Sequence, residues 1–357
     1  MKPILYVKGS TETDVRLSKF LKFFEAVNVA TSFIGWNRTH SQKSSNSQNI
    51  NYIFSGGGKN NKYVMFYYPL WMIVVFFHFL FKKNVRDYNL IAVNFDTALP
   101  IFIVSKIRKI EFTYEIYDQF ALSYNFPDFL KKWLILLDQR IMSKAQLIIH
   151  VDANRVHSHF EKSIVIENTP TDFYKGADRS YEEVSHKFAV SGLLNKLRGI
   201  DQIIRFAGDN PKVNFLFVGE ILDKDLNNKV NSMDNIEKYD FMPQDDLFLL
   251  MQDCCGVFSL YNPSIEINKL AASNKVYDAM MLGIPVITNV EVVNSKIIMD
   301  NGIGEVINYN YDSSWAHLAD PSFINSAISV GKVGRKLYLD DFEFSRIVTD
   351  RLMHRLN

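Results

Sequence analysis

Residues 261–289 read YNPSIEINKLAASNKVYDAMMLGIPVITN, and this stretch decides the fold of the second half of the chain. Ser273 and Asn274 are favourable N-cap residues, and the pattern of residues 275–282 predicts a helix. Gly283 is suited to the left-handed position that ends a helix, and a proline two residues later prevents its continuation. The apolar run that follows predicts a buried strand. The stretch therefore predicts a turn, a capped helix and a strand, in the order of an α/β protein.

The start of this predicted helix is suited to an anion. Free backbone N–H groups at residues 273–275 and the positive end of the helix dipole attract a phosphate, and Lys275 adds a charge beside them. Asp278 lies four residues after Asn274, on the same helix face, where its oxygens could accept hydrogen bonds from the two hydroxyls of a ribose. The alternative is structural, because capped helices before apolar strands occur in any α/β protein.

Length and composition indicate a globular protein of two domains. The chain has 357 residues, which exceeds what one hydrophobic core usually organises. Apolar residues make up 47% and charged residues 22%, which argues against extensive disorder. The first residues lack a signal-peptide apolar region, so we expect a cytoplasmic protein. Cys254 and Cys255 are adjacent, so they could form a disulfide only with strain.

The charge is distributed unevenly along the chain. Residues 1–175 hold 22 Lys and Arg against 14 Asp and Glu, whereas residues 176–357 hold 18 against 25. The first half is therefore basic, which suggests an anionic partner such as a phosphorylated acceptor or a membrane surface. Nucleic acid is not expected, because the basic residues are scattered and no nucleic-acid motif is visible.

Apolar runs and helical patterns alternate along both halves of the chain. This alternation predicts the fold class α/β, with two Rossmann-like doubly wound domains facing a cleft. In the first half we expect strands at 4–7, 30–35, 90–94, 112–116 and 147–151, a further strand ending at residue 54, and helices at 15–26 and 128–144. In the second half we expect strands at 187–191, 214–218, 236–241, 256–260 and 286–288, and helices at 200–208, 245–252 and 275–282.

The run SNKVYDAMMLGIPVITN at 273–289 resembles the C-domain signature of family 4 of the retaining, GT-B-fold glycosyltransferases. Other segments are similar to further parts of that family: DYNLIAVNFDTALP, FTYEIYDQFALSYNFP, FAVSGLLNKLRGIDQIIRFA, FLFVGE and GRKLYLDDFEFSRIVTDRL. The resemblance covers nearly the whole chain. It implies an acceptor-binding domain at 1–177, completed by a crossing helix at 342–357, and a nucleotide-sugar-binding domain at 178–341.

The resemblance implies a retaining glycosyltransferase, an enzyme that moves a sugar from a UDP- or GDP-sugar to a glycan acceptor. Such an enzyme stabilises the charge that develops on the diphosphate leaving group. The loop LNKLRG corresponds to the phosphate loop of the family, so Arg198 and Lys196 would contact the diphosphate together with Lys275. Gly192 is followed by leucine where the family usually has arginine, and we favour Arg198 over Lys196. For each cation the alternative is a solvated loop charge.

The resemblance also implies the remaining donor and acceptor residues. The full donor-binding set is Gly192, Lys196, Ser264, Glu266, Ser273, Asn274 and Asp278, and the catalytic set is Asp118, Arg198 and Lys275. The usual pair of glutamates has an altered spacing here, so Glu266 is either a sugar ligand or an exposed loop carboxylate. On the acceptor side we place Gly9, Ser10 and Asp96. Asp118 follows Tyr117 where the family often has His-Asp, and both aspartates could instead be helix caps.

The segment YVMFYYPLWMIVVFFHFLF at 63–81 is too apolar for a solvent-facing helix. We expect Pro69 to interrupt a continuous helix, which leaves a segment too short to span a bilayer. One interpretation is a helix packed inside the protein or against a partner, and the other is contact of residues 69–86 with an anionic membrane surface. We favour the second, with a polyprenol-linked acceptor in cell-surface polysaccharide assembly at the inner face of the membrane.

Two other functions compete with glycosyl transfer. A nucleotide-sugar epimerase would share the two-domain fold, and a non-catalytic scaffold of this fold would explain the missing histidine and the altered glutamate spacing. No cofactor and no metal are expected. His157 and His159 are two residues apart, and no third ligand is evident in the sequence nearby.

Overall fold

The computed structural model describes residues 1–38, 49–57, 64–123, 126–156, 160–177, 179–269 and 273–356. The chain forms two compact units, Met1–Asn168 with Ile347–Asn357, and Thr169–Arg346. The second unit thus begins before the boundary expected at residue 178, which itself lies outside the described residues. Its start is held by Arg335, whose guanidinium donates to both carboxylate oxygens of Asp172 at 2.6 and 3.0 Å and to the carbonyl of Ala177 at 3.1 Å.

The first unit contains a parallel sheet of seven strands in the order β3-β2-β1-β4-β5-β6-β7. The strands are β1 (Ile4–Lys8), β2 (Thr31–Asn37), β3 (Ile50–Ser55), β4 (Asn89–Val93), β5 (Thr113–Ile116), β6 (Leu147–His150) and β7 (Ser163–Val165). Strands β1 and β4 are neighbours, and the strand order reverses between them. In open parallel sheets, ligands bind beyond the carboxyl ends of the strands at such a point.

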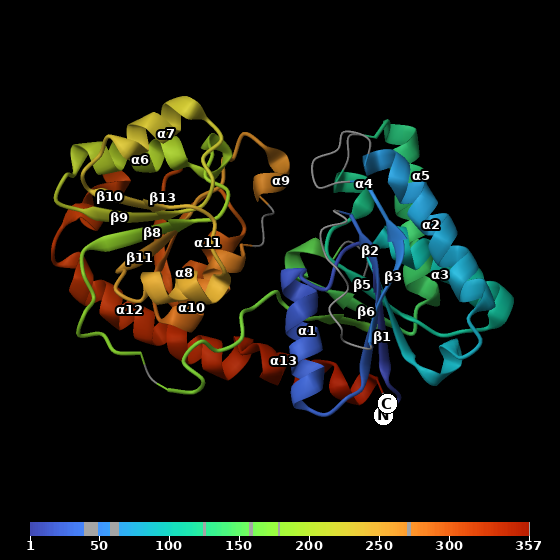
Figure 1. The fold of residues 1–357 in the computed structure, drawn as a ribbon. Coiled ribbons are helices and arrows are strands. Elements are labelled where there is room, and N and C mark those ends of the chain that lie inside the picture. Colours follow the sequence, from blue (N-terminus) through green and yellow to red (C-terminus); the bar gives the residue numbers. More distant parts are fainter. Residues whose placement is uncertain are drawn as a thin grey trace. The chain divides into compact units, whose positions relative to one another are not determined.

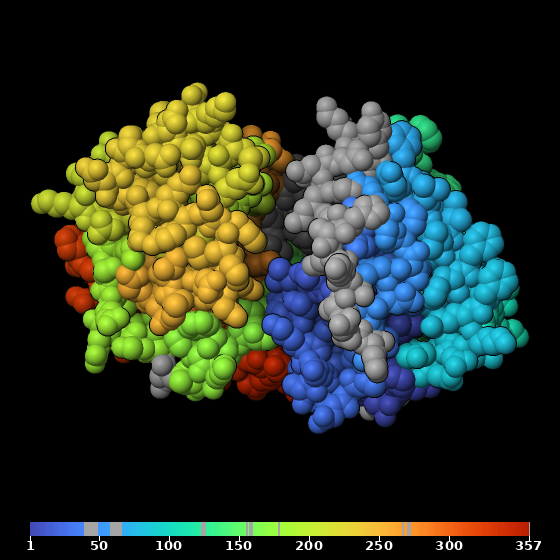
Figure 2. Space-filling view, viewed as in Figure 1, coloured from blue at the N-terminus to red at the C-terminus, as the bar shows by residue number. Residues whose placement is uncertain are grey.

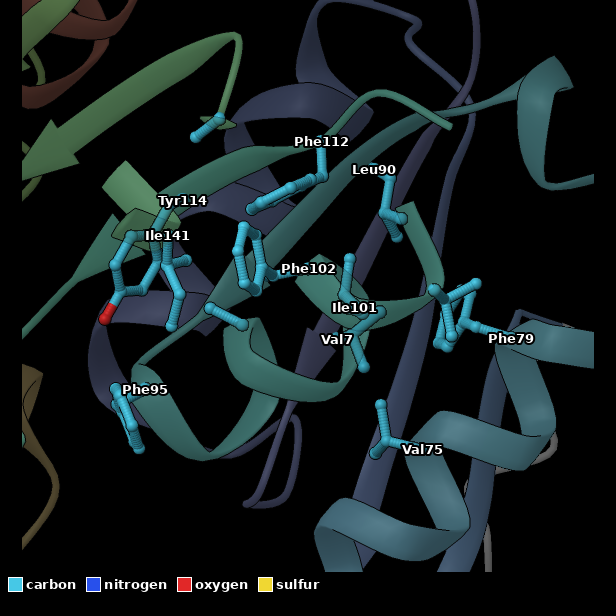
Figure 3. Close-up of a cluster of buried hydrophobic side chains, with 14 of the residues drawn as sticks. Val7, Val75, Phe79, Leu90, Phe95, Ile101, Phe102, Phe112, Tyr114 and Ile141 are labelled. Carbon is cyan, nitrogen blue, oxygen red and sulfur yellow. The ribbon is translucent and has the colours of Figure 1, made fainter. Parts of the chain in front are cut away.

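Helices cover both faces of this sheet. They are α1 (Val15–Ala26), α2 (Val64–Phe81), α3 (Phe95–Arg108), α4 (Phe120–Ser123) and α5 (Asp128–Lys144), with 3-10 turns at Val85–Asp87 and Ala153–Arg155. Figure 1 shows α2, α3 and α5 on one face of the sheet and α1 on the other. Side chains of α2, α3, α5 and the strands form one apolar cluster, part of which is drawn in Figure 3. The chain later returns to this unit through α13 (Phe344–Arg351) and a turn at Met353–Arg355.

Helix α2 is continuous, so the expectation that Pro69 would interrupt it is wrong. Proline removes one backbone hydrogen bond from a helix and crowds the preceding turn. Here the cost is offset by burial, because Trp71, Val75 and Phe79 recur at helical spacing and all three are fully buried. Among the described residues, no helix is both long enough and apolar enough to cross a membrane.

The second unit repeats the same topology with six parallel strands in the order β10-β9-β8-β11-β12-β13. The strands are β8 (Lys187–Ser191), β9 (Asn214–Val218), β10 (Ile236–Tyr239), β11 (Gly256–Ser259), β12 (Val286–Asn289) and β13 (Gly304–Ile307). The strand order reverses between β8 and β11. The expected fold class is confirmed: each unit is a doubly wound α/β domain.

Two apolar cores lie on the two faces of the second sheet. One packs α6 (Ile200–Asp209), α7 (Lys224–Asn231) and a 3-10 segment at Ser313–Ala319, and the other packs α8 (Gln244–Met251), α10 (Asn274–Leu282) and α11 (Asn294–Asn301). Helix α12 (Phe323–Leu337) continues into a π-helical turn at Tyr338–Phe342, and short segments lie at Lys196–Arg198 and at α9 (Glu266–Lys269).

The burial pattern of α2 predicts how two aromatic substitutions will differ. Trp71→Ala removes a fully buried side chain and should lower the free energy of unfolding of the first unit by about 3–5 kcal/mol. Phe66→Ala, on the same helix, removes a side chain that is 72% exposed and should change it by less than about 0.5 kcal/mol. Urea denaturation of the two variants measures the difference, and equal effects would contradict this account of the helix.

Candidate functional site

Two glycines fix the loop that follows the central strand β8 of the second unit. Gly192 has a φ of 97°, and its N–H donates to the carbonyl of Val218 at 2.9 Å. Gly219, at the end of β9, has a φ of 145°, and a Cβ there would lie only 1.9 Å from the Gly192 carbonyl oxygen. Both positions require glycine, because one is in the left-handed region and the other admits no side chain. The loop is thereby held at the point where the strand order reverses.

The first turn of α10 lies at the same edge of this sheet. Ser273 occupies the N-cap position, as predicted, but its side chain does not cap the helix. Its hydroxyl instead accepts a hydrogen bond of 2.7 Å from the hydroxyl of Ser259, the last residue of β11. This bond ties the helix start to the strand beside β8. The first backbone N–H groups of α10 therefore have no side-chain cap among the described residues, which suits an anion at this position.

Lys275 lies beside Gly192. A Cβ at position 192 would be 3.5 Å from the Lys275 ammonium nitrogen, an ordinary contact distance, so the ammonium lies directly beside the loop. Burial lowers the pKa of Lys275, the nearby charge of Arg198 lowers it further, and Tyr261 and Asp278 oppose the shift. A desolvated cation favours an anionic ligand, which would restore its charge balance. The predicted residues Gly192, Ser273 and Lys275 are thus brought together.

The two cations of the loop have different surroundings. The Arg198 guanidinium stacks on the ring of Tyr261 at 4.1 Å, and its buried Nη1 has no hydrogen-bond partner among the described residues. Lys196 is largely exposed and forms an ion pair with Asp223 at 3.3 Å. The Nη1 group of Arg198 is therefore available to donate to a ligand, whereas Lys196 is already paired with Asp223. This supports our preference for Arg198.

The other donor residues are placed less closely together. Asp278 lies one turn into α10 and accepts a hydrogen bond from Gln244 at 3.2 Å, and Asn274 is exposed. Ser264 is exposed in the turn after β11, where its N–H donates to the side chain of Asn262 at 2.9 Å. Glu266 opens α9, but its side chain lies outside the described residues. Whether these residues contact a donor stays a prediction.

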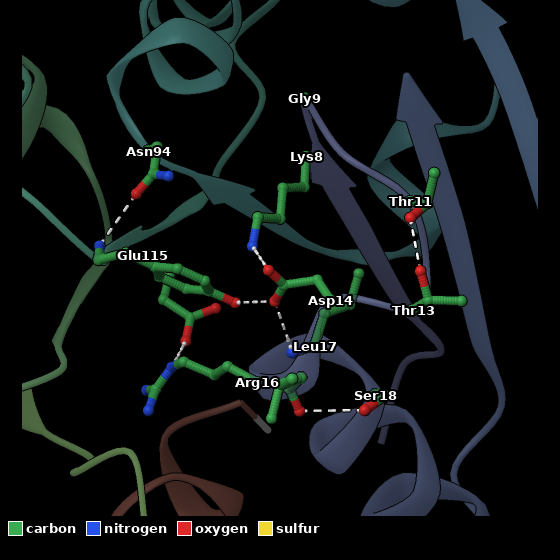
Figure 4. A network of polar contacts seen from close by, with 12 residues as sticks. Lys8, Gly9, Thr11, Thr13, Asp14, Arg16, Leu17, Ser18, Asn94 and Glu115 are labelled. Atoms are coloured by element: carbon green, nitrogen blue, oxygen red, sulfur yellow. Dashed lines mark hydrogen bonds and ion pairs between the residues drawn. The ribbon is translucent and has the colours of Figure 1, made fainter. Parts of the chain in front are cut away.

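In the first unit, a buried network of charges lies at the carboxyl ends of β1 and β5 (Figure 4). Lys8 pairs with Asp14 at 2.7 Å, and Arg16 pairs with Glu115 at 2.8 Å. The Lys8 ammonium also lies over the ring of Tyr117, 3.9 Å from its centre. Burial raises the pKa of Glu115, and the Arg16 charge opposes this shift. The sequence does not predict the pair of Arg16 and Glu115, because its members are 99 residues apart in the chain.

Asp96 lies beside this network, in the first turn of α3. It is buried, and a Cβ at Gly9 would be 2.5 Å from one of its carboxylate oxygens. Burial raises the pKa of Asp96 to about 6, although the charge of Arg38 opposes the shift. Arg38 donates to the carbonyl of Gly9 at 2.7 Å, which ties the two strands β1 and β2 together at this point. Gly9 and Asp96, both candidates for the acceptor side, thus lie side by side.

Ser10 and Asp118 are the remaining acceptor-side predictions. Ser10 is half-buried, and its carbonyl accepts a hydrogen bond from the N–H of Trp36 at 3.1 Å. Asp118 is exposed after the end of β5. Sequence reasoning did not identify Arg38, which could have been found only from its place at the end of the second strand. Roles in acceptor binding stay predictions for all of these residues.

Within the part of the chain that the structure describes, no group of three or more His, Cys, Asp or Glu is placed to hold a metal ion. His157 and His159 lie outside that part.

The raised pKa of Asp96 predicts a pH dependence of stability. Its folded value of about 6 exceeds the unfolded value of about 3.9, so between about pH 4 and pH 6 the folded chain binds more protons than the unfolded chain. The free energy of unfolding should therefore fall as pH rises through this window. Asp96→Asn cannot titrate and should remove up to about 3 kcal/mol of that fall in denaturation curves measured from pH 4 to pH 7.

Two comparisons define this experiment. Asp138 is also buried with a pKa raised to about 6, so part of the slope should remain in Asp96→Asn. Leu222→Ala changes an exposed side chain that cannot titrate and should keep the wild-type slope. If Asp96→Asn keeps the full slope as well, the environment assigned to Asp96 is wrong.

Comparison with known proteins gives matches in structure only: no family model and no curated protein matches the sequence. HepE of Anabaena in complex with UDP matches with a TM-score of 0.68 and 14% identity, over 98% of both chains. Sucrose-phosphate synthase from Thermosynechococcus elongatus matches with a TM-score of 0.69 and 12% identity, over 98% of this chain and 97% of that one. The lipopolysaccharide outer core galactosyltransferase WaaB matches with a TM-score of 0.62 and 10% identity, over 99% of both chains. The chain therefore has the GT-B fold of these proteins along nearly its whole length.

Proposed function

We propose that this chain is a glycosyltransferase that takes its sugar from a nucleoside diphosphate sugar. The observation that carries the proposal is the meeting of Lys275, Arg198 and the start of α10 beside Gly192, where the strand order reverses. Two cations and an uncapped helix start suit the two phosphates of such a donor. Further support comes from HepE, which has the same fold and has been crystallised with UDP and with UDP-glucose.

The proposed chemistry needs mainly charge stabilisation. Departure of the nucleoside diphosphate leaves negative charge on the phosphate oxygens, and fixed cations in a desolvated site lower the energy of that state. Arg198 and Lys275 would supply these charges without a metal ion. Asp278, one turn further along α10, would accept hydrogen bonds from the ribose hydroxyls. The donor is a UDP- or GDP-sugar, and transfer proceeds with retention, as the resemblance implies.

The acceptor is proposed to be a glycan, bound by the first unit. Gly9, Ser10, Asp96 and Asp118 belong to the carboxyl edge of its sheet, where ligands of open parallel sheets bind. Asp96, with a pKa of about 6, could donate or accept a hydrogen bond to an acceptor hydroxyl near neutral pH. The aromatic side chains Trp36 and Trp71 lie beside Gly9 and stack on each other, with 6.0 Å between their ring centres.

We also propose that the protein is cytoplasmic and attaches to the inner face of the membrane through α2, where the acceptor is lipid-linked. Five apolar side chains that are at least 49% exposed follow one face of this helix: Phe66, Leu70, Ile73, Phe77 and Phe81. Lys83 and Arg86, both exposed, follow the helix end. The segment forms part of the surface of the first unit, in light blue and cyan in Figure 2. An apolar stripe beside cations suits an anionic lipid surface.

A non-catalytic scaffold of the same fold is the second candidate. Tyr117 stands immediately before Asp118, where the family often has a histidine. The missing histidine is the observation that favours a scaffold. Nucleotide binding alone does not separate the two functions, whereas hydrolysis of the donor or transfer of its sugar by the purified protein would exclude the scaffold. An epimerase would convert the donor sugar with no acceptor present.

Calorimetric titration with UDP, GDP, ADP and CMP tests the donor site. We expect one nucleoside diphosphate to bind, and Arg198→Ala and Asp278→Ala to weaken it about tenfold or more, because each removes a charge-assisted hydrogen bond. Lys196→Ala removes a cation from the same loop that already pairs with Asp223, and it should change the affinity less than about threefold. Absence of binding to the folded wild type would overturn the donor site.

Flotation with vesicles that contain phosphatidylglycerol tests the membrane contact. At low salt the wild type should float with the vesicles, and Ile73→Glu combined with Phe77→Glu should reduce the bound fraction about tenfold, because it places two charges on the apolar stripe. The matched control, Leu222→Glu with Leu249→Glu, makes the same change at two exposed leucines of the second unit and should float as the wild type does. A wild type that stays unbound would refute the contact.

A further inference from the structure

We propose that the second unit has a further binding site, for a phosphorylated anion, at the carboxyl end of α10. A cavity of about 510 Å³ is present there, lined by Arg179, Tyr181, Lys332, Arg335, Lys336 and Asp340. It is separate from the proposed donor site, which lies at the other end of the same helix. The nine residues of α10 put the two ends roughly 13 Å apart.

The cavity is lined by more positive than negative charge. Four of its side chains are cations and only Asp340 is an acid. The charge of Arg335 is met by Asp172, whose two oxygens lie 2.6 and 3.0 Å from its guanidinium nitrogens. The Arg179 guanidinium donates to backbone carbonyls, among them those of Gly283 and Cys254, and forms no ion pair among the described residues. An excess of positive charge therefore remains after the internal pairs are counted.

The two arginines are held rigidly. Each is at least 94% buried, and each has an Nε that lacks a hydrogen-bond partner among the described residues. Part of their role is structural, since Arg335 also donates to the carbonyl of Met281 at 3.0 Å, in the last turn of α10. That role accounts for the Nη groups of both side chains. It does not account for the Nε groups or for the lysines beside them.

Lys332 and Lys336 give the second, independent observation. They lie one turn apart on α12 and both are exposed, and neither forms an ion pair within the described part of the chain. Like charges at this spacing destabilise a helix. An anion bound between Lys332 and Lys336 would remove that repulsion and stabilise α12. The Lys332 ammonium lies 5.3 Å from the ring centre of Tyr181, and the Arg179 guanidinium lies 4.9 Å from the same ring centre. Both cations therefore lie beside the same aromatic ring.

The expected ligand carries a phosphate or a diphosphate. Two exposed ammonium groups can approach its oxygens, the buried guanidinium groups add fixed positive charge behind them, and the ring of Tyr181 offers an apolar wall. The volume admits a phosphorylated small molecule as well as a single phosphate. The same chemistry is presented by a soluble phosphorylated compound and by the phosphate of a lipid headgroup, and the experiment separates these two sources.

Pyrophosphate is the probe for the soluble source, with hydrogen exchange measured by mass spectrometry to locate the binding. We expect pyrophosphate to slow exchange in residues 329–341, and Lys332→Ala with Lys336→Ala to weaken this effect about tenfold or more. The matched control, Lys224→Ala with Lys229→Ala, removes two exposed lysines of α7 and should leave it unchanged. Lys275→Ala should also leave it unchanged, because that residue belongs to the donor site at the other end of α10.

Vesicles that contain phosphatidic acid are the probe for the lipid source. A headgroup is the ligand if the Lys332 and Lys336 double variant reduces flotation relative to the α7 control. A soluble compound is the ligand if the double variant weakens only the pyrophosphate effect. The proposal is overturned if pyrophosphate slows exchange only at residues 192–199 and 273–278, or if the double variant matches the wild type in both assays. All four lysines are exposed, so the variants should fold.

Discussion

The close contact of two backbone segments, the Gly192 carbonyl against Gly219, is the constraint on which the second unit's candidate site depends. A side chain is excluded at Gly219, because a Cβ there would overlap the carbonyl oxygen of Gly192, and Gly192 itself has a φ of 97° that favours glycine. The loop after β8 is therefore held against β9, with Gly192 beside the ammonium group of Lys275. Burial of the Lys275 ammonium is the main cause of its lowered pKa.

Much of the fold could be predicted from the sequence, because local signals agree with the tertiary structure in most elements. The helices Val15–Ala26 and Asp128–Lys144 and the strands Lys187–Ser191 and Asn214–Val218 have the predicted bounds. Each has a clear apolar period and suitable flanking residues. The prediction was wrong at Pro69, where three buried side chains on one helix face outweigh the local cost of the proline.

The candidate site was predictable where a motif carried it and not where long-range contacts did. Ser273 and Lys275 follow from the capping pattern, which is local. The bond between the Ser259 and Ser273 hydroxyls joins a strand end to a helix start, so no local pattern indicates it. The same holds for the pair of Arg16 and Glu115, whose members are 99 residues apart. Such pairs depend on the order of strands in the sheet, which becomes known only from the fold.

Cationic side chains lie at both ends of α10: its own Lys275 at the amino end and Arg335 of α12 at the carboxyl end. A helix dipole favours cations only at the carboxyl end. At that end Arg335 contacts the carbonyl of Met281, which is the ordinary arrangement. At the amino end Lys275 is a cation beside a positive dipole end, which costs stability unless an anion is present. This local conflict is typical of binding sites, where a protein sacrifices stability for function.

The return of the chain to the first unit constrains how the protein can fold during synthesis. Residues Ile347–Asn357 belong to that unit, and Val348 and Leu352 are fully buried. The carbonyl of Leu356 accepts a hydrogen bond of 2.6 Å from the side chain of Asn89, at the start of β4. A ribosome makes this segment only after the whole of the second unit. The unit that is translated first is therefore the one completed last, and the apolar surface that Val348 and Leu352 cover stays exposed until the end of synthesis.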